Sequence, residues 1–469
     1  MKQITLKSLL LISTATLPLA SFATGFQSNE FSPTLQGQAM AGDGAAAGDV
    51  TAIFVNPAVL STIHRPELYI GGTYYNPRLA MNNASAGHGV YSGPVSPSIL
   101  PSPITDGSNS EKNIMSAVGI PAFYLALPVN SKLTYGISFT SPWNYHSHYA
   151  ADSVVRYMAQ NTEILSYNIA SFVSYAVNDQ LSFAGGIEDQ YLYADFSNFN
   201  GLYTPSTPDT NASSASNMGG DNIALGYTLG MLYTPTADTK LGISYRSPIL
   251  YTINGEVDQY VQTGGLAPTD ACTSALPSVA NNCHSFFAMH MQTPGVLNLS
   301  LAQQLNQQWQ LNFTTEATFW GETENIDFDM PDAYLNKATL SEDWHTSVLY
   351  ALGAAYKFNS QWTFRSGLGY ETTPTLDNTR DARFPENDKV LAAIGSSYQW
   401  NQRLRLDLSY EHAFIANQSI NANQEWASIR GFPGGGIPVA PVPVAEANQV
   451  QADYSGSADM LALGLNYIF

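Results

Sequence analysis

The feature that most constrains this chain is an alternation of apolar and polar residues with a period of two, repeated along most of its length. Within residues 402–411, one set of alternate positions holds Leu404, Leu406, Leu408 and Tyr410, and the other holds Arg403, Arg405, Asp407 and Ser409. A strand with this sequence is apolar on one face and charged on the other, whereas a helix would scatter the charges around its circumference. The pattern predicts a β-strand with both arginines on its polar side.

The same alternation occurs in residues 221–234, 308–315 and 457–469, and the last of these ends on the aromatic Phe469, a typical end for a barrel protein. Similar stretches indicate about fourteen strands, an even number. They fall near 66–76, 114–127, 131–140, 163–177, 180–193, 221–234, 238–250, 286–302, 307–320, 346–358, 361–371, 386–399, 402–413 and 457–469.

The N-terminus reads as a secretory signal over residues 1–23, with Lys2 and Lys7 beside an apolar stretch and Ala23 before the cut, so the mature chain is expected to begin at Thr24. Beyond it, no apolar run approaches the ~18 residues that a membrane-spanning helix needs. Aromatic and charged residues each make up 12% of the chain, a composition more typical of a membrane barrel than of a soluble protein. A soluble β-sandwich is the alternative, but it seldom needs so many aromatic residues near its strand ends.

We therefore predict an all-β fold, a transmembrane antiparallel β-barrel of about fourteen strands over residues 66–469, in the outer membrane of a Gram-negative cell. Short connectors suit periplasmic turns, which also places both termini in the periplasm. Long connectors are expected to be extracellular loops, near 77–113, 141–162, 194–220, 251–285, 321–345, 372–385 and 414–456.

Charge and cysteine content narrow the possible partners. The formal net charge is −19, and removal of two lysines with the signal gives −19 − 2 = −21, which disfavours nucleic acid. The only cysteines are Cys272 and Cys283, and an exported chain favours a disulfide between them. A metal site would want more ligands than this stretch offers.

Residues 24–65 differ in kind, being rich in Gly and Ala and lacking strand alternation. A lumen of about fourteen strands is wider than the side-chain-filled eight-stranded barrels and would leak solutes if empty. We therefore expect this segment to be a hatch, or plug, inside the lumen.

The series that begins at the predicted mature end resembles the FadL-type long-chain fatty-acid and hydrocarbon transporters of the outer membrane. The resemblance rests on 25–27, 29–31, the Gly/Ala run 37–47 and above all Asn56-Pro57-Ala58, in order and at matching spacing, and further on 245–247, 293–294, 362–367 with Tyr370 and Pro374, and 383–388. It implies a hatch in a fourteen-stranded barrel, an apolar outer groove, an inner pocket near the hatch N-terminus, and lateral exit at an interrupted third strand.

The resemblance also suggests roles for individual residues. Phe26 would touch bound ligand, or else pack the hatch against the wall. Asn56, Pro57 and Ala58 would anchor the hatch beside the gate, or else form an ordinary turn into the first strand. Gly136 would kink the third strand, or else be a small residue facing the lumen.

Apolar loop residues could form the first groove for a lipophile, or else pack on one another: Phe196, Phe199, Leu202 and Tyr203. Fatty-acid members of the family often carry basic residues just after the fifth strand, and residues 193–198 carry none. This departure either puts a free carboxylate ligand in doubt or moves its cationic partner elsewhere. The candidates for that cation are Arg246, His345, Arg365, Arg403 and Arg405, most of which are expected to pair with acids across the lumen.

His146 and His148 alternate in a predicted loop and are expected to be exposed rather than to bind metal, and no convincing catalytic set is present. We predict no enzymatic activity, no cofactor and no metal.

The leading hypothesis is passive uptake of hydrophobic compounds, above all long-chain fatty acids, with aromatic or aliphatic hydrocarbons as the alternative cargo. An acidic-looped adhesin or structural barrel and a barrel enzyme are the rivals from other classes. Expected partners are the lipophile, outer-membrane lipid and lipopolysaccharide, and the barrel assembly machinery, for a chain expected to be monomeric and not to bind nucleic acid.

Overall fold

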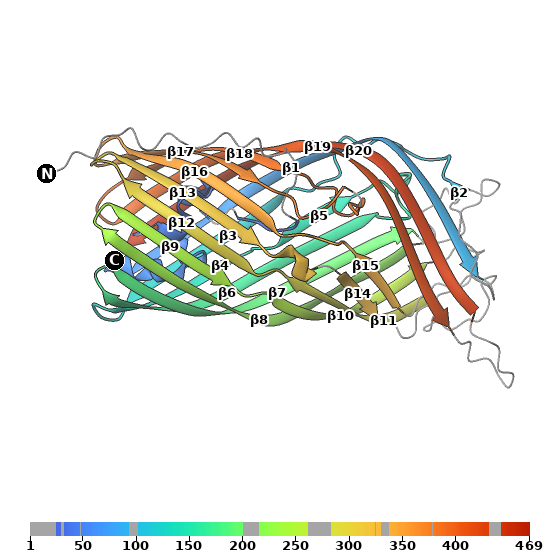
Figure 1. Cartoon of the computed structure of the whole chain (residues 1–469), viewed down its shortest axis with the longest axis horizontal. Coiled ribbons are helices and arrows are strands. Elements are labelled where there is room, and N and C mark those ends of the chain that lie inside the picture. The colour runs from blue at the N-terminus through green and yellow to red at the C-terminus, as the bar shows by residue number, and fades with distance from the viewer. Residues whose placement is uncertain are drawn as a thin grey trace, which may run out of the picture.

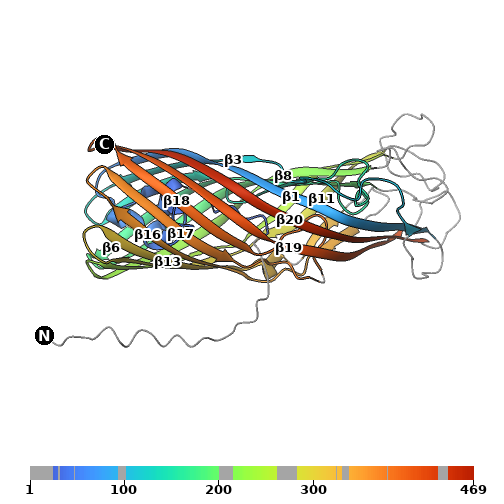
Figure 2. The same cartoon turned by 90° about the horizontal axis from the view of Figure 1, so that it is seen from above.

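The chain forms a closed antiparallel barrel in which fourteen strands surround an N-terminal segment (Figure 1; Figure 2). The computed structural model describes residues 25–29, 32–46, 48–92, 102–199, 215–260, 283–323, 325–329, 337–377, 379–430 and 442–469. The first and last strands pair with each other from Glu67–Ile468 onward and so close the barrel. The predicted fold class and strand number are confirmed.

Nine of the fourteen strands are unbroken: β1 (Glu67–Ser92), β3 (Val118–Pro128), β6 (Asn161–Asn178), β7 (Leu181–Phe199), β8 (Ala215–Thr236), β17 (Trp362–Glu371), β18 (Lys389–Gln399), β19 (Leu404–Arg430) and β20 (Val442–Ile468). Each of the other five consists of two pieces: β4 (Leu133–Thr140) with β5 (Asn144–His148), β9 (Thr239–Arg246) with β10 (Ile249–Tyr260), β11 (Cys283–Thr293) with β12 (Val296–Gln304), β13 (Trp309–Thr318) with β14 (Asn325–Asp329), and β15 (Lys337–Ser341) with β16 (Ser347–Lys357). The short β2 (Ser102–Pro103) pairs with the outer part of β1, and the 3-10 helix η4 (Trp320–Thr323) lies between β13 and β14.

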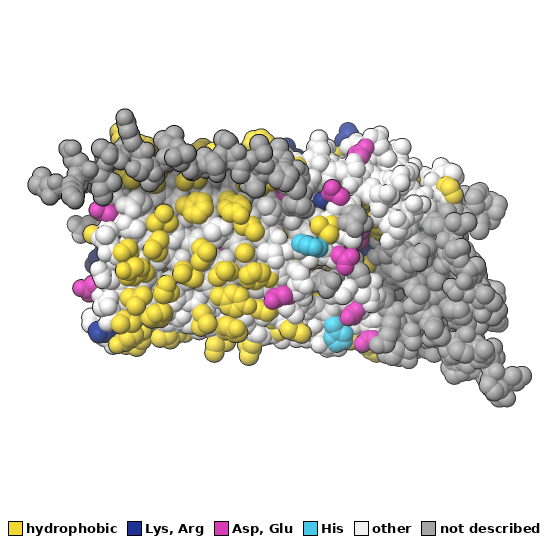
Figure 3. Space-filling model, viewed as in Figure 1, with side chains coloured by type: hydrophobic (Ala, Val, Ile, Leu, Met, Phe, Trp, Pro, Cys, Tyr) yellow, Lys and Arg dark blue, Asp and Glu magenta, His cyan; other side chains and the backbone are white. Residues whose placement is uncertain are grey.

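The alternation places apolar side chains outside and small or polar ones inside, as predicted. On β8, Ile223 and Leu225 are 62% and 69% exposed, whereas Thr228 on the opposite face is buried. Figure 3 shows such apolar side chains gathered in a belt over one end of the barrel, with acidic and histidine side chains beyond it. A belt of this kind is the surface that contacts the hydrocarbon of a bilayer.

One strand face was predicted incorrectly at its first residue. Arg405 and Asp407 do face the interior, but Arg403 is exposed in the turn before β19. Asn401 Oδ1 caps this turn by accepting hydrogen bonds from the backbone N–H groups of Arg403 and Leu404. The pairing of the strand therefore begins only at Leu404.

Several strands run much farther than predicted into segments that had been expected to be loops. β1 continues to Ser92, β19 continues to Arg430, and β20 begins at Val442. These extensions lie beyond the apolar belt, where outward-facing residues meet water and no longer need to be apolar. The alternation therefore disappears although the backbone pairing between β19 and β20 continues.

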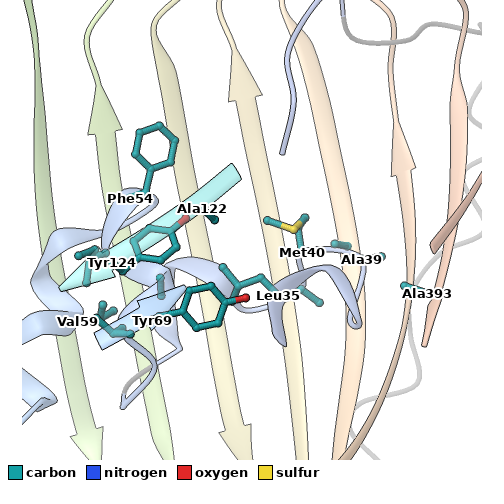
Figure 4. Packing of buried hydrophobic residues seen from close by; sticks show 14 of the residues in the cluster. Leu35, Ala39, Met40, Phe54, Val59, Tyr69, Ala122, Tyr124 and Ala393 are labelled. Atoms are coloured by element: carbon teal, nitrogen blue, oxygen red, sulfur yellow. The ribbon is translucent and has the colours of Figure 1, made fainter. Parts of the chain in front are cut away.

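The N-terminal segment, residues 25–63, lies within the barrel. It contains α1 (Pro33–Gln36) and the 3-10 helices η1 (Asp43–Ala45), η2 (Val50–Phe54) and η3 (Pro57–Thr62). η3 contacts β4, β6, β7 and β8; η1 contacts β9 and β12; and α1 contacts β18, β19 and β20. A segment that touches strands all around a closed barrel occupies its lumen, and Figure 4 shows its side chains packed against the inward-facing Tyr69, Tyr124 and Ala393.

Polar contacts tie this segment to the wall. The carboxylate of Asp43 accepts hydrogen bonds from Asn298 Nδ2 (3.1 Å), Ser300 Oγ (2.9 Å) and Thr314 Oγ1 (2.9 Å), all from β12 and β13. Across the lumen, Asp49 lies 3.8 Å from the guanidinium of Arg405. Burying these polar groups is tolerable because each has a partner.

Some predictions fall outside the described residues, including the signal sequence 1–23, Cys272, and the side chain of Cys283. The disulfide stays a prediction, which thiol labelling before and after reduction would test. No helix among the described residues is long and apolar enough to cross a membrane.

Candidate functional site

The third strand of the barrel is interrupted between β4 and β5. Thr140 pairs with Asn168 of β6, and Asn144 pairs with Leu165, so four steps along the third strand match only three along β6. One residue is therefore extra, which is the definition of a β-bulge, and Pro142 lies in it.

The opposite edge of the third strand separates from β3 at the same level. The described ladder between β3 and β4 ends at Phe123–Phe139, and the next bridge toward the extracellular side joins Met115 to Ser147. Between these two points, the backbone of β3 from Val118 onward pairs with β1 only. The wall is thus open between β3 and β5 over a short stretch.

The start of the N-terminal segment covers the inner side of this interruption. Ser28 N donates to Pro142 O (2.8 Å), Asn144 N donates to Phe26 O (2.9 Å), and Gln27 forms a bridge with Trp143. Backbone groups left without a ladder partner at membrane depth need such substitutes. The chain that blocks the opening therefore also satisfies its hydrogen bonds.

A cavity of about 270 Å³ passes through the wall at this place. Met40, Leu391 and Met460 line it from the inner face, where they are buried. Leu165 and Tyr167 line it from the outer face of β6, and Tyr167 is 39% exposed. Residues from both faces can line one cavity only if the cavity crosses the wall between them.

Beside this cavity lies a buried aromatic cluster built around Phe26. Its ring centroid lies 4.8 Å from that of Trp320, 5.8 Å from those of Trp143 and Trp344, and 6.3 Å from that of Phe384. Phe196 joins the same cluster through Phe384, at 6.5 Å. The structure thus brings two sequence-predicted ligand residues, Phe26 and Phe196, into one apolar site.

The sequence interpretation missed the rest of this cluster. Three of the seven tryptophans of the chain surround Phe26, although they come from the third strand, η4 and the segment before β16. Tryptophan is rare in this chain, and this rarity was the signal that could have drawn attention to these residues. That they lie close together could not be read from the sequence, because it depends on closure of the barrel. Phe199, in contrast, packs on Tyr157 (6.4 Å) in a separate buried cluster, and Leu202 and Tyr203 lie outside the described residues.

Asn56, Pro57 and Ala58, which were predicted to anchor the hatch, lie at the start of η3. Asn56 Nδ2 donates to Gly44 O (2.7 Å) within the segment and to Met231 O (3.0 Å) of β8, and its Oδ1 accepts the N–H of Ala58 at the start of η3. Pro57 occupies the first position of that helix, where its missing N–H is harmless. Ala58 O accepts from Ser182 Oγ (3.2 Å) of β7.

Gly136 lies within the regular part of β4, paired to both neighbours, rather than at the interruption. A Cβ at this position would lie 2.7 Å from the side chain of Leu60. This position agrees with the second interpretation of Gly136, a small residue that faces the lumen. Its lack of a side chain leaves room for Leu60 of η3.

The basic residues suggested by the sequence do not line the cavity. Arg405 lies 3.8 Å from Asp49 across the lumen, as expected, and also binds Asp407 of its own strand (3.0 Å), whereas Arg365 donates to the neutral Ser397 Oγ (2.6 Å). His345 is exposed and contacts the carbonyl of Asp343. Arg246 lies over the Phe54 ring (4.5 Å) and the Trp143 ring (5.7 Å), next to a smaller cavity.

Lys389, which the sequence interpretation did not select, is the one lysine or arginine among the described residues that line the cavity. Its Nζ lies 4.0 Å from a carboxylate oxygen of Glu386, and it is paired in register with Glu371. Glu163 and Glu411 also line the cavity. Burial raises the pKa of Glu386, and Lys389 opposes that shift. The cation is therefore already surrounded by acids.

His146 and His148 lie in strand β5 rather than in a loop; His148 is exposed, as expected, whereas His146 is half-buried and hydrogen-bonds through Nε2 to Asn161 Oδ1 (3.1 Å). Across the described ranges, no group of three or more His, Cys, Asp or Glu residues could hold a metal ion.

Comparison with known proteins places this architecture in a family. The "Long-chain fatty acid transport protein" of Escherichia coli O6:H1 is 24% identical over 427 residues, which cover 87% of this chain and 91% of that protein. The crystal structure of a Pseudomonas aeruginosa FadL homologue superposes with a TM-score of 0.77 at 22% identity, covering 95% of this chain and 100% of the other. The Ralstonia pickettii toluene transporter TbuX gives a TM-score of 0.60 at 14% identity, covering 91% and 98%.

These two structures share the fold. The family described as "Outer membrane protein transport protein (OMPP1/FadL/TodX)" matches residues 14–469. With a closed barrel of fourteen strands and a match over almost its whole length, the chain belongs to this family of outer-membrane transport proteins.

Proposed function

We propose that this protein carries hydrophobic compounds passively from the outside medium to the cavity at the β4–β5 interruption, and releases them sideways through the wall. The observation that carries this proposal is the cavity itself, because its lining includes both the lumen face and the membrane-facing side of β6. A water-soluble cargo would gain nothing from a path into the bilayer, whereas a lipophile partitions there.

In this proposal residues 24–65 act as a hatch. Its first residues cover the opening through three backbone contacts, at Phe26, Gln27 and Ser28, whereas Asn56, Pro57 and Ala58 anchor its far end to β7 and β8. A small shift of the first residues would uncover the opening without releasing the anchor. No nucleotide motif is present in the sequence, so the transport is downhill.

The cargo we propose is a long-chain fatty acid or a similar lipophile that is recognised by its apolar bulk. Each buried methylene contributes about 0.8 kcal/mol, so a long chain binds without many polar contacts. Phe26 and Phe196 supply the apolar contacts. Phe199, which packs in the separate cluster with Tyr157, and Leu202 and Tyr203, which lie outside the described residues, stay proposed groove residues. The names of the relatives, which include a fatty acid transporter and a toluene transporter, support this class of ligand.

Hydrocarbons are the second candidate cargo, and the charge of the cavity favours them. Lys389 is flanked by acids, and Arg365 and Arg405 are engaged elsewhere. A free carboxylate would meet like charges, which disfavour it by several kcal/mol at close range when partly shielded from water. His345 and Arg403, both exposed, stay predicted contacts at most.

Uptake of a radiolabelled C16 fatty acid and of a labelled hydrocarbon by cells with and without the protein tests this proposal. We expect faster uptake of at least one of the two when the protein is present. If the uptake of each compound is the same with and without the protein, and the protein instead promotes attachment of cells to surfaces, the result would support an adhesin. Hydrolysis of lipid esters by purified protein would support an enzyme. We also propose that the protein acts as a monomer surrounded by outer-membrane lipid and lipopolysaccharide, after insertion by the barrel assembly machinery.

A further inference from the structure

The connection between β17 and β18 crosses the interior of the barrel to contact the region of β5 and β7, and its second part, residues 379–388, is termed the strap here. Phe384 of the strap is fully buried, which is unusual for a residue in a connection between strands. Its ring centroid lies 5.0 Å from that of Tyr145, 5.2 Å from that of Trp344 and 6.3 Å from that of Phe26. The strap thus inserts one aromatic side chain into the centre of the proposed ligand site.

Hydrogen bonds to the region of β5 hold the strap down. Tyr149 Oη donates to Ala382 O (2.7 Å), and Tyr145 Oη donates to Arg383 O (2.8 Å). Within the strap, Asp381 accepts the backbone N–H groups of Arg383 (2.8 Å) and Phe384 (3.2 Å), which fixes the local turn. Ser147 Oγ also donates to Arg383 O (3.3 Å), and the end of the strap is tied to β19 where Asn387 Nδ2 donates to Asn417 O (3.0 Å) and Gln418 donates to Pro385 O. Each such bond contributes only about 1 kcal/mol net.

Arg383 extends the strap to the opposite side of the site. Its buried guanidinium lies 3.4 Å from Ser197 O and 3.5 Å from Asn198 Oδ1 on β7, and 5.8 Å from the ring of Phe196. These contacts are long for charge-assisted hydrogen bonds, which are usually below 3 Å. The strap therefore bridges β5 and β7 beside Phe26.

Two of the other residues around Phe26 are also held by hydrogen bonds. The backbone N–H of Trp143 donates to Ser166 Oγ (2.8 Å), and the indole N–H of Trp320 donates to Ser347 Oγ (3.1 Å). The ring of Phe384 has packing contacts alone, and it is carried by a connection rather than by a strand. Trp320 and Trp344 also lie between strands, but Phe384 lies in the strap, so its ring can move without a change in the pairing of the barrel wall.

The strap also adjoins the cavity in the wall. Glu386 lines that cavity, and Tyr145 both lines it and packs on the ring of Phe384. Withdrawal of Phe384 would therefore leave an apolar space beside Phe26, next to Tyr145, which also lines the cavity.

We propose that Phe384 is a displaceable stopper: it occupies the place of the ligand's apolar chain or ring, and a ligand enters by lifting the strap. The inference rests on the proposed function, since it names the residue that sets access to the same site. The part of a ligand that replaces the Phe384 side chain must be apolar and must fill about the space of a phenyl ring.

The tryptophans around Phe26 make this testable by fluorescence. The probe is the methyl ester of a dibrominated C18 fatty acid, whose bromines quench nearby tryptophans, added to purified full-length protein in detergent micelles. Phe384→Ala removes the stopper, and we expect faster association and a dissociation constant at least tenfold lower than in the wild type. Phe328→Ala is the matched control, because it removes the same volume from the same cluster, but from strand β14. We expect unchanged or weaker binding there.

Equal or weaker binding by Phe384→Ala would overturn the proposal, since Phe384 would then be part of the pocket wall. A double variant, Tyr145→Phe with Tyr149→Phe, keeps every ring and removes the two hydroxyl contacts to the strap, together with the contact between the hydroxyls of Tyr149 and Tyr454 (2.9 Å). It should also bind faster, and an unchanged association rate would count against the strap even if Phe384→Ala failed to fold. Failure of the wild-type protein to bind the ester or a hydrocarbon would refute the proposed function instead.

Discussion

A single methyl group on the inner face of β9 should dislodge the N-terminal segment. Gly242 faces Gly44 so closely that a Cβ at position 242 would lie 2.0 Å from Gly44 O and 2.5 Å from Gly44 C. Contacts of a Cβ below 3.0 Å are essentially never observed, so Gly242→Ala requires a shift of at least about 1.0 Å, from 3.0 minus 2.0. The clash is with backbone and cannot be relieved by a rotamer change.

The expected energy follows from what that shift breaks. Gly44 O accepts from Asn56 Nδ2 (2.7 Å), and Gly44 N donates to Ser300 Oγ (3.0 Å). Loss of one such bond costs about 1 kcal/mol, and overpacking adds about 1–3 kcal/mol, so docking of the segment should weaken by about 2–4 kcal/mol. The ladder hydrogen bonds of β9 do not involve the side chain, and the barrel should remain closed.

Planar-bilayer conductance and limited proteolysis measure this effect. Gly242→Ala should show ion-conducting events and cleavage within residues 25–63, both rare in the wild type. Gly185→Ala is the matched control, because a Cβ there meets its nearest neighbour at an ordinary 3.7 Å. If Gly242→Ala is as silent and as protease-resistant as the control, the reasoning about the close approach of Gly44 is refuted.

Two further predictions concern charge. Because Lys389 already has a carboxylate 4.0 Å away, a fatty acid and its methyl ester should compete comparably for purified protein, and Lys389→Met should leave ester binding unchanged; a tenfold preference for the acid, about 1.4 kcal/mol, would contradict this. Burial, and then the charge of Asp381, raise the pKa of Glu342 well above its usual value, with Asp343 acting in the same direction and Arg383 against it. A raised acid pKa stabilises the closed strap at low pH, and that stability is lost as the pH rises through the raised value. Proteolysis of the strap should therefore accelerate with rising pH, and Glu342→Gln should flatten the profile; an identical profile in both proteins would rule out this carboxyl as the cause.

The membrane part of the fold was predictable because lipid imposes one simple rule on the sequence. Wherever a strand crosses the belt, its outward residues must be apolar, and β8 follows this rule at Ile223, Leu225, Tyr227 and Leu229. Beyond the belt the rule lapses, so the outer parts of β1, β19 and β20 were mistaken for loops. Arg403 was misplaced for a related reason: alternation locates a strand but not the turn that precedes it.

The site was predictable only in part. Phe26 and Phe196 could be named from the resemblance, but their neighbours Trp344 and Phe384 come from segments more than 140 residues farther along the chain, counted from Phe196. Such contacts arise only when the barrel closes, and no local pattern records them. Lys389 was missed because a lysine at a strand start is ordinary; its significance comes from the cavity that it lines.

The central claim, lateral release through the interrupted wall, is tested most directly by removing the interruption. Since β4 and β5 pair with β6 in registers that differ by one residue, deletion of Pro142 should restore a continuous third strand and extend its pairing with β3. Uptake of a labelled lipophile should be measured in cells that contain equal outer-membrane amounts of wild-type and deleted protein, each with heat-modifiable migration. We expect the deletion to reduce uptake to the level of cells without the protein. Undiminished uptake by the correctly folded deletion variant would contradict lateral release.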